Sequence, residues 1–415
     1  MSEVQVVSFG CRLNAYEAEV ITAKARAAGI NNTIIVNTCA VTMEAERKNR
    51  QAIRRLAREN PGAKLFVTGC ASHLKPESYA ALPGVSGVIA NDAKLKIESY
   101  APLAKREEDE NFFAKDFEKK PRVYLQVQNG CDHRCTFCII PFGRGASRSI
   151  PVGVIAARLR GLVAQGVNEV VFTGVDITSY GKDLPGTPSL GQMARRVLAL
   201  VPELPRLRFS SLDPAVMDED LWRLFAKEPR VMPHLHLSVQ AGDDMILKRM
   251  KRRHARKDIL KIAARAQALR PDVALGADLI AGFPTEDEAM FRNTFDLVEE
   301  AGLTWLHVFP YSPRPGTPAA RMPQLDPKIR NARALQLRRA GEKAVQNLLH
   351  SMVGKMEEVL VEKNDGGKCL GRTRNYAEVA FTSNIPAGEL AMVQINRVEG
   401  ACLAALDEKT GLQAA

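Results

Sequence analysis

The chain has 415 residues, of which 46% are hydrophobic and 25% are charged, and its formal net charge is +11 at pH 7. This length and balance exclude a disordered or fibrous chain and predict a globular protein of two or three domains, while the positive charge favours a polyanionic partner such as nucleic acid. The amino-terminal residues lack the pattern of a signal peptide, and no apolar run approaches the ~20 residues of a membrane-spanning helix, so we expect a cytoplasmic protein.

Residues 1–105 alternate short β-rich runs with helical patterns. The β-rich runs are 4–9, 33–37 and 64–69, and the helical patterns between them are 14–29 and 44–60. This alternation predicts an N-terminal α/β domain built on an open, mostly parallel sheet. Residues 106–120 are highly charged without clear periodicity, which predicts a linker.

Residues 121–350 contain further β-rich runs separated by helical stretches. The runs are 123–128, 169–174, 206–211, 234–239, 273–282 and 305–312. A closed eight-unit barrel needs about 250 residues, so this series predicts a partial (β/α)6 barrel, trailed by a basic helix over 329–349. In residues 351–415 short strands alternate with turn residues, which predicts a small antiparallel β-barrel. The expected fold class is therefore α/β with three domains.

Three of the eight cysteines crowd into the stretch CDHRCTFC, at Cys131, Cys135 and Cys138. We call them the loop cysteines. They follow the 123–128 strand, and β/α folds build their sites at this end of the strands. Structural zinc normally takes four protein ligands, so three thiolates favour a [4Fe–4S] cluster with one open iron. His133 is a candidate ligand, although a polar loop residue is the simpler interpretation.

Three other cysteines, Cys11, Cys39 and Cys70, each follow a predicted strand of the first domain. We call them the N-terminal cysteines. They are spaced by about one ~30-residue βαβ unit, so we expect them at one edge of the sheet, where they would form a second three-thiolate site. Three separately packed cysteines are the alternative. Cys369 and Cys402 lie within strand patterns of the tail and are interpreted as small buried apolar residues.

The stretch CDHRCTFCIIPFGRG resembles the signature loop of radical S-adenosylmethionine enzymes. The motifs around it are similar, in number and order, to those of the methylthiotransferases of that superfamily; they include SFGCRLN, VNTCAVT, VTGCAS, TGVDITSYG and DLIAGFPTE. CRLN and VNTCAVT look most like the branch that acts on threonylcarbamoyladenosine of tRNA, because the isopentenyladenosine branch usually shows a CQMN-like first motif. The resemblance covers nearly the whole chain, and the tail resembles the RNA-binding TRAM barrel.

The resemblance implies two [4Fe–4S] clusters and S-adenosylmethionine as cofactors. The cluster on the loop cysteines would bind S-adenosylmethionine, and one electron would cleave it to a 5′-deoxyadenosyl radical. This radical would take the hydrogen from carbon 2 of the adenine next to the anticodon. The cluster on the N-terminal cysteines would supply the sulfur of the methylthio group that replaces it. A one-electron reductant such as flavodoxin or ferredoxin is also implied.

Motif position alone assigns candidate contacts to S-adenosylmethionine. They are Gly174, Asp176, Ser211, Gln240, Gly282 and Phe309. The first two stand where the superfamily often has a Gly-Glu-like pair for the methionyl end, and the aspartate in place of glutamate leaves that side chain's role open. The next two follow later strands and can reach ribose or carboxylate. The last two offer backbone and apolar surface to the adenine. The alternative for each is a turn or a packing role.

Basic segments point to RNA. Three helical stretches, 47–58, 248–257 and 330–343, are rich in arginine and lysine. For each of them, a charged helix face that is simply exposed to water is the alternative. In the tail, Arg372 and Arg374 are candidate phosphate contacts and Tyr376 is a candidate stacking platform for a base. Sequence-specific readers of RNA favour splayed loop bases, so a tRNA anticodon stem-loop is the expected partner.

Other functions remain open. The same chemistry could act on isopentenyladenosine of tRNA or on an aspartate of a ribosomal protein. A non-catalytic iron–sulfur or zinc RNA-binding protein would use the same cysteines without forming a radical. The positive charge and the basic tail favour RNA over a ribosomal protein as the substrate.

Overall fold

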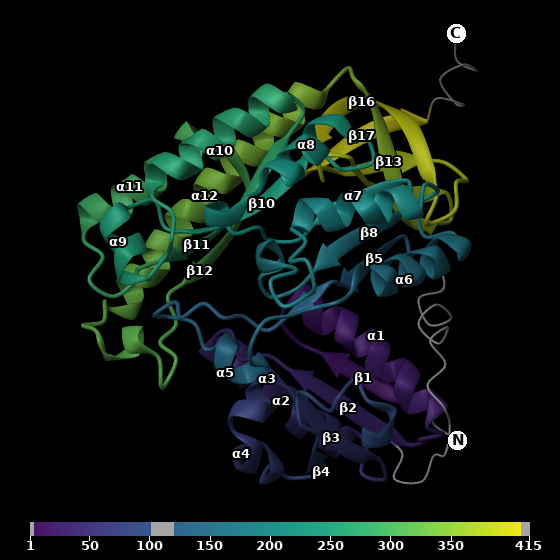
Figure 1. The fold of residues 1–415 in the computed structure, drawn as a ribbon, viewed down its shortest axis with the longest axis vertical. Helices are drawn as coiled ribbons and strands as arrows, with labels where there is room; N and C mark the ends of the chain where they lie inside the picture. The colour runs from purple at the N-terminus through teal and green to yellow at the C-terminus, as the bar shows by residue number, and fades with distance from the viewer. Residues whose placement is uncertain (1–3, 101–119, 408–415) are drawn as a thin grey trace.

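The computed structural model describes residues 4–100 and 120–407, and Figure 1 shows its three sheet-based parts following one another in chain order. The predicted division at 1–105, 121–350 and 351–415 stays a prediction, and residues 106–119 of the predicted linker lie outside the described residues. Within the described ranges, no helix has the length and apolar character that crossing a membrane requires.

The N-terminal part is a parallel sheet in the order β1-β2-β3-β4. Its strands are β1 (Gln5–Ser8), β2 (Thr33–Thr38), β3 (Lys64–Gly69) and β4 (Val85–Val88), and its helices are α1 (Arg12–Ala27), α2 (Met43–Glu59), α3 (Cys70–Leu74) and α4 (Pro76–Ala80). β2 is buried along its whole length, as an apolar run inside a parallel sheet should be. The predicted open α/β sheet is confirmed, and β4 adds a strand that was not predicted.

The core consists of two three-stranded parallel sheets. The strands are β5 (Arg122–Gln126), β8 (Glu169–Thr173) and β9 (Arg206–Phe209) in one sheet, and β10 (His234–Gln240), β11 (Ala274–Ala281) and β12 (Leu303–Pro310) in the other. Isolated parallel bridges, Leu207 with Val231 and Leu212 with Leu237, join β9 to β10. The six strands therefore follow one another as the predicted partial barrel.

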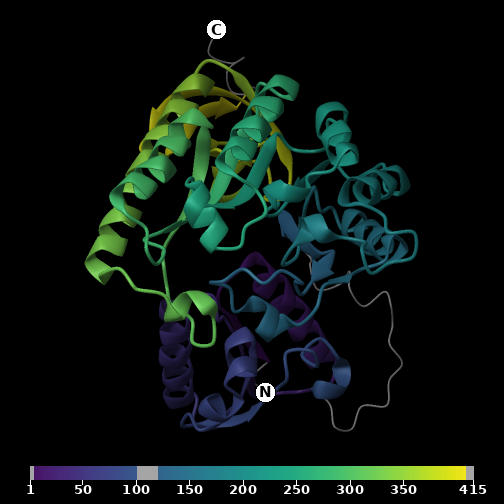
Figure 2. The same cartoon turned by 60° about the vertical axis from the view of Figure 1, so that its left-hand side comes forward.

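Helices cover the outside of this partial barrel (Figure 2). They are α6 (Val152–Ala164), α7 (Leu190–Leu200), α8 (Glu219–Lys227), α9 (Asp244–Arg249), α10 (Arg256–Leu269), α11 (Glu288–Glu300) and α12 (Pro327–Met352). Between β5 and α6 lie β6 (Gln128–Asn129), α5 (Ile140–Arg144) and β7 (Arg148–Ser149). Short 3₁₀ turns occupy Ile97–Ser99, Ile177–Ser179, Pro214–Val216 and Pro318–Arg321.

Capping residues in the sequence set where several helices begin. The Thr42 hydroxyl accepts from the N–H of Ala45 at the start of α2, and Ser189 forms a capping box with Gln192 at the start of α7. Asp326 caps α12, where a proline at the first helical position needs no hydrogen-bond partner for its nitrogen. Of these caps, Thr42 also lines the candidate site described below.

Both edges of the partial barrel are covered. α1 of the N-terminal part packs on β5, and its residues Leu13, Tyr16 and Val20 belong to the buried cluster of the core. α12 packs on β12 at the other edge. Because the free edges of a sheet are otherwise open to unwanted pairing, this packing both protects the core and fixes the N-terminal sheet against it.

The C-terminal part is a closed barrel of five strands in the order β13-β14-β15-β17-β16. The strands are β13 (Met356–Asp365), β14 (Lys368–Thr373), β15 (Glu378–Thr382), β16 (Leu390–Glu399) and β17 (Cys402–Asp407). The predicted small barrel is confirmed, but β15 and β17 pair in parallel rather than antiparallel. An odd number of strands cannot close a ring in which every neighbour runs in the opposite direction, so one parallel pair is required.

Candidate active site between the N-terminal sheet and the core

The loop cysteines lie between β6 and α5, past the carboxyl end of β5. Gly130 begins the loop at φ +73°, and a Cβ there would lie 1.8 Å from the carbonyl oxygen of Ala146, so this turn requires glycine. The N–H of Cys131 donates to the carbonyl of Gly145 at 3.1 Å. The hydroxyl of Thr136 donates to the carbonyl of the last residue of α9 at 2.8 Å, which anchors the middle of the loop.

The loop thiols lie close enough to act on one another. Burial raises the pKa of Cys131 to about 11 and that of Cys138 to about 12, and the neighbouring Cys135 thiol adds to both shifts. The guanidinium of Arg252 lies 3.7 Å from Cys135 Sγ. Such thiols lose their protons when a metal centre binds, so the donor set fits an iron–sulfur cluster held by three thiolates.

The N-terminal cysteines also gather, at the carboxyl ends of neighbouring strands. Cys11 precedes α1, Cys39 follows β2 and Cys70 begins α3. Gly10, the residue before Cys11, has a φ of +100°, and a Cβ there would lie 2.5 Å from Cys39 Sγ. Only glycine therefore allows the chain before Cys11 to lie this close to Cys39. Burial raises the pKa of Cys39 to about 12, and the Cys11 and Cys70 thiols add to the shift. The structure therefore brings together the three thiols that the strand spacing predicted.

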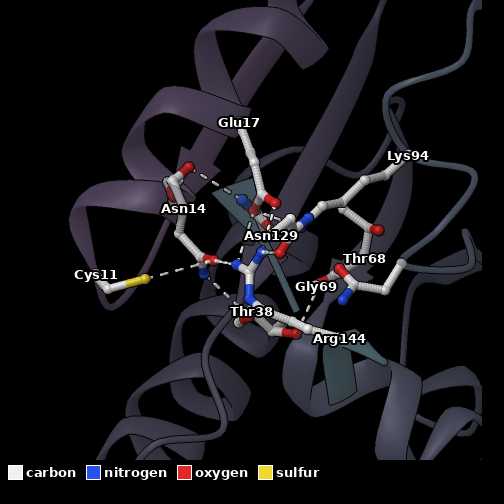
Figure 3. A network of polar contacts seen from close by, with 12 residues as sticks. Cys11, Asn14, Glu17, Thr38, Thr68, Gly69, Lys94, Asn129 and Arg144 are labelled. Carbon is white, nitrogen blue, oxygen red and sulfur yellow. Dashed lines mark hydrogen bonds and ion pairs between the residues drawn. The ribbon is translucent and has the colours of Figure 1, made fainter. Parts of the chain in front are cut away.

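A buried polar network joins this edge of the sheet to the core (Figure 3). Arg144, from the end of α5, forms an ion pair with Glu17 of α1 at 2.7 Å. Lys94 pairs with the same carboxylate at 2.5 Å. Burial would raise the pKa of Glu17, but the two cations more than offset this and lower it.

The residues predicted for the methionyl end lie beside the loop cysteines. Asp176 accepts a hydrogen bond from His133 Nε2 at 2.8 Å, and the ligand atoms of Asp176, His133 and Cys131 all lie within 4.8 Å of one another. Burial favours the neutral acid, but hydrogen bonds hold the pKa of Asp176 at about 2. Gly174 lies against Gln128, whose Oε1 accepts from the N–H of Asp176 at 2.9 Å. Because His133 bonds to Asp176, its interpretation as a polar loop residue needs no metal.

A cavity of about 250 Å³ lies between the N-terminal sheet and the carboxyl ends of β10 to β12. It is lined by Val41, Thr42, Phe137, Gln240, Asp278, Ile280, Phe309, Pro310, Tyr311 and Ser312. Two predicted cofactor contacts, Gln240 and Phe309, are thus in its wall. The N–H of Met43 at the start of α2 donates to the Ser312 hydroxyl at 3.0 Å, so the N-terminal sheet and the core touch beside this cavity.

The other two predicted cofactor contacts are not in the wall of this cavity. Ser211 lies two residues past β9 and is partly buried. Gly282 packs against α12, where a Cβ would lie 2.4 Å from Cγ of Arg330. Close packing on a helix accounts for this glycine without a cofactor, whereas the roles of both residues toward S-adenosylmethionine stay predictions.

Asp278 is the acidic group in the wall of the cavity. His236 Nε2 lies 3.0 Å from Asp278 Oδ1, and His307 Nδ1 lies 3.1 Å from the same oxygen. Burial would raise the pKa of Asp278, but these two hydrogen bonds hold it below its ordinary value. Burial lowers the pKa of His236, so this imidazole is neutral and donates its proton to the carboxylate. Among the residues that the structure describes, both histidines bond to the same oxygen of Asp278, and its second oxygen can accept from a ligand.

The predicted RNA-binding residues lie where the C-terminal barrel meets the start of the core strands. Tyr376 stacks on His234 with ring centroids 5.2 Å apart, and the guanidinium of Arg208 lies 5.0 Å from the Tyr376 ring centre. Arg372 forms an ion pair with Glu378 at 2.9 Å. Arg374 donates to the carbonyl of Pro229 at 2.6 Å. Arg374 and Tyr376 therefore join the barrel to the core, whereas the ion pair of Arg372 lies within the barrel, between β14 and β15. RNA binding by the three residues stays a prediction.

Comparisons with known proteins agree with this site. A family described as the Radical SAM superfamily matches residues 125–298, and the Uncharacterized protein family UPF0004 matches residues 3–90. The threonylcarbamoyladenosine tRNA methylthiotransferase MtaB of Rickettsia prowazekii is 46% identical over 404 residues, with 95% of each chain covered. The tRNA-2-methylthio-N(6)-dimethylallyladenosine synthase of Erythrobacter litoralis is 33% identical over 419 residues, with 94% of each chain covered.

Among solved structures, the radical S-adenosylmethionine methyltransferase TsrM of Kitasatospora setae matches with a TM-score of 0.52 at 13% identity, covering 77% of this chain and 75% of that one. A likeness at this identity shows the fold. The chain belongs to the methylthiotransferase family of radical S-adenosylmethionine enzymes, in the threonylcarbamoyladenosine branch. It is therefore an enzyme, and its cofactors are those predicted, S-adenosylmethionine and [4Fe–4S] clusters.

Sequence reasoning missed several residues of the site. Asp278 is the first residue of the DLIAGFPTE motif, but the sequence does not predict its place in the cavity wall. His236 is the second histidine of an alternating strand, and a polar residue with this period in an apolar strand could have indicated a partner inside the barrel. For Arg144 and Glu17 no such signal exists, because each is an ordinary charged residue until the core docks on the N-terminal sheet.

Proposed function

We propose that the chain replaces the hydrogen on carbon 2 of threonylcarbamoyladenosine, next to the anticodon of tRNA, with a methylthio group. The cavity, whose wall includes chain neighbours of both cysteine sets, is the observation that supports this most. Its wall contains Val41, whose N–H lies 3.5 Å from Cys39 Sγ, and Phe137, which is next to Cys138 in the chain. A substrate base in this cavity would lie beside these neighbours of both sets.

The loop cysteines and the N-terminal cysteines fit two [4Fe–4S] clusters. When bound, the first cluster with S-adenosylmethionine supplies a 5′-deoxyadenosyl radical and the second supplies sulfur. The chain's own residues hold and shield these groups. Phe137, Phe309 and Tyr311 give the cavity an apolar wall that keeps water away from a reactive species. Gly174, Asp176, Ser211, Gln240 and Gly282 remain the proposed contacts to S-adenosylmethionine.

Asp278 supplies recognition in the same cavity. Its carboxylate is held as an anion by His236 and His307, so it accepts a hydrogen bond from an N–H of the substrate or the cofactor. An amine, the exocyclic N–H of a modified adenine or a ureido N–H has the required chemistry. A neutral Asn at this position would present the same shape without the charge.

A basic groove lies along the helix that begins beside the cavity. Arg47, Arg50, Arg54 and Arg58 of α2 line a groove of about 430 Å³ with Gln51. α2 begins directly after Thr42, which lines the cavity, so RNA phosphates bound along the groove would lead a loop base toward the site. Arg372, Arg374 and Tyr376 are the second proposed RNA surface. If both arginines are replaced with alanine and the salt dependence of tRNA binding does not change, these arginines do not contact RNA phosphates.

The relative that is 46% identical is a threonylcarbamoyladenosine methylthiotransferase, which supports this substrate, and the relative that is 33% identical acts on dimethylallyladenosine, also called isopentenyladenosine. Isopentenyladenosine of tRNA is therefore the second candidate. Mass spectrometry of tRNA nucleosides from a deletion strain tests both: we expect the methylthio form of threonylcarbamoyladenosine to disappear and the unmethylthiolated form to accumulate. Loss of only the isopentenyl derivative would support the second candidate, and unchanged tRNA would overturn the proposal.

The cellular setting follows from this chemistry. A one-electron reductant such as flavodoxin or ferredoxin would serve the loop cluster, and a tRNA substrate places the enzyme in the cytoplasm. A ribosomal-protein aspartate or a purely RNA-binding role would leave tRNA unmodified by the purified protein. Anaerobic incubation with S-adenosylmethionine, a reductant and tRNA lacking the modification separates these outcomes.

A further inference from the structure

Arg144 follows β5 of the core in the chain, but its side chain is buried against α1 of the N-terminal part. It is 2% exposed, and its Nη1 lies 2.7 Å from Glu17 Oε1. Its Nη2 donates to Asn14 Oδ1 at 2.6 Å. Asn14 and Glu17 both come from α1, the helix that begins directly after Cys11 (Figure 3). The guanidinium therefore holds the helix that positions one of the N-terminal cysteines.

The same guanidinium also holds the loop cysteines. Arg144 Nη1 donates to Asn129 Oδ1 at 3.0 Å, and this oxygen accepts the N–H of Gly130 at 2.9 Å. Gly130 is the residue before Cys131, and the N–H of Cys131 in turn donates to the carbonyl of Gly145, the residue after Arg144. One side chain thus links the start of the cysteine loop to the N-terminal sheet.

The network around Arg144 carries more positive than negative charge. Lys94 is 1% exposed and donates to Glu17 at 2.5 Å and to Asn37 Oδ1 at 3.3 Å. In the described part of the chain, no second carboxylate bonds to Lys94 or to Arg144. Burying an unbalanced cation is costly, and burial lowers the pKa of Lys94 even though Glu17 raises it. A further anion beside the network would remove this cost.

The N-terminal cysteines are next to these cations. Arg144 and Lys94 both act electrostatically on the Cys70 thiol, and Arg144 acts on the Cys39 thiol as well. α5 packs on Cys70 so closely that a Cβ at Gly143 would lie 3.5 Å from Cys70 Cβ. Three thiolates outweigh the positive charge of an oxidised [4Fe–4S] core, so a cluster here is an anion.

We propose that Arg144 and Lys94 are the built-in counter-charge of the cluster on the N-terminal cysteines, and that Arg144 thereby sets the reduction potential of this cluster. The inference rests on the proposed function, because it takes these cysteines as cluster ligands. Reduction adds an electron to an anion, so each nearby cation makes the reduced state more favourable and raises the potential. Arg144 is a positioning residue that also links the cluster to the core.

The test uses the full chain with the three loop cysteines replaced by alanine, so that only the N-terminal cluster is reconstituted. Its potential is measured by a redox titration followed by EPR. We expect Arg144→Gln to lower the ratio of reduced to oxidised cluster at a fixed potential about tenfold, a shift of about 59 mV for a one-electron couple. Arg144→Lys keeps the charge and should stay near the parent. Loss of docking contacts alone would affect both variants alike.

Further variants keep the inference falsifiable if Arg144→Gln does not fold. Lys94→Gln removes the second cation without touching the core, and it should lower the potential in the same direction. Arg253→Gln, beside the loop cysteines, is the matched control and should change nothing at the N-terminal cluster. Full iron content with an unmoved potential in the Gln variants would overturn this inference alone. A parent protein that binds no iron would overturn it together with the N-terminal cluster assignment.

Discussion

Replacing Cys39 with alanine should separate the two halves of the chemistry. Cys39 is 3% exposed, lies against Gly10, and has the N–H of Val41 3.5 Å from its sulfur. With both sites loaded, each set of three cysteines holds four iron atoms. The variant should therefore lose roughly half of the iron and acid-labile sulfide of the parent. It should still cleave S-adenosylmethionine to 5′-deoxyadenosine while leaving tRNA without a methylthio group.

The assay for this prediction is anaerobic reconstitution, followed by iron and sulfide analysis and by mass spectrometry of nucleosides from one reaction. Cys402→Ala is the matched control, because this partly buried cysteine lies in β17 of the C-terminal barrel, and it should keep all of the iron. Removing one sulfur from a buried site costs about 1 kcal/mol of packing, too little to unfold the chain. Full methylthio transfer by Cys39→Ala would refute the assignment and make these cysteines packing residues.

Other variants test other parts of the molecule. Cys135→Ala should abolish 5′-deoxyadenosine formation but keep tRNA binding, and undiminished cleavage would contradict the loop assignment. Arg54→Ala with Arg58→Ala should reduce the slope of log affinity for tRNA against log salt by up to about 2, whereas the exposed pair Arg195 and Arg196 on α7, replaced likewise, should leave it unchanged. Glu169→Gln should cost about 3 kcal/mol of unfolding free energy at pH 7, because hydrogen bonds and ion pairs with Arg208 and Arg122 overcome burial and lower the pKa of Glu169 to about 2. This contribution is present above pH ~4.5 and is lost as the pH falls toward about 2, so urea unfolding should show the two proteins converging in acid.

The parts that the sequence predicted well depend on local pattern. Strand and helix alternate with a clear period, and carboxyl ends of parallel strands meet at one edge, so the gathering of Cys11, Cys39 and Cys70 followed from their positions in the chain alone. For the loop cysteines, their close spacing in the chain was enough to predict a site of three thiolates. The partial barrel followed from the number of strands between 121 and 350.

The parts that could not be predicted depend on how distant segments dock. Arg144 and Glu17 are 127 residues apart, and neither lies in a pattern that indicates a partner. Asp278 meets His307 because these residues are paired across β11 and β12, and such register is set by the three-dimensional sheet. Tyr376 is predicted as a stacking platform for a base, and its contacts with Arg208 and His234 form only when the barrel packs on the core, which no local pattern indicates.

The position of α5 over Cys70 has a consequence for the order in which the protein matures. The N-terminal sheet leaves the ribosome first, and within it Glu17 and Lys94 already form a neutral pair. Cys70 becomes covered only when the core has folded and Gly143 lies on it, with Asn91 holding the carbonyl of Gly143 at 2.6 Å. α5 therefore closes the Cys70 side of the N-terminal cysteines, whereas Cys11 stays exposed after the core has docked. Iron and sulfide that arrive after the core has docked would therefore approach from the Cys11 side.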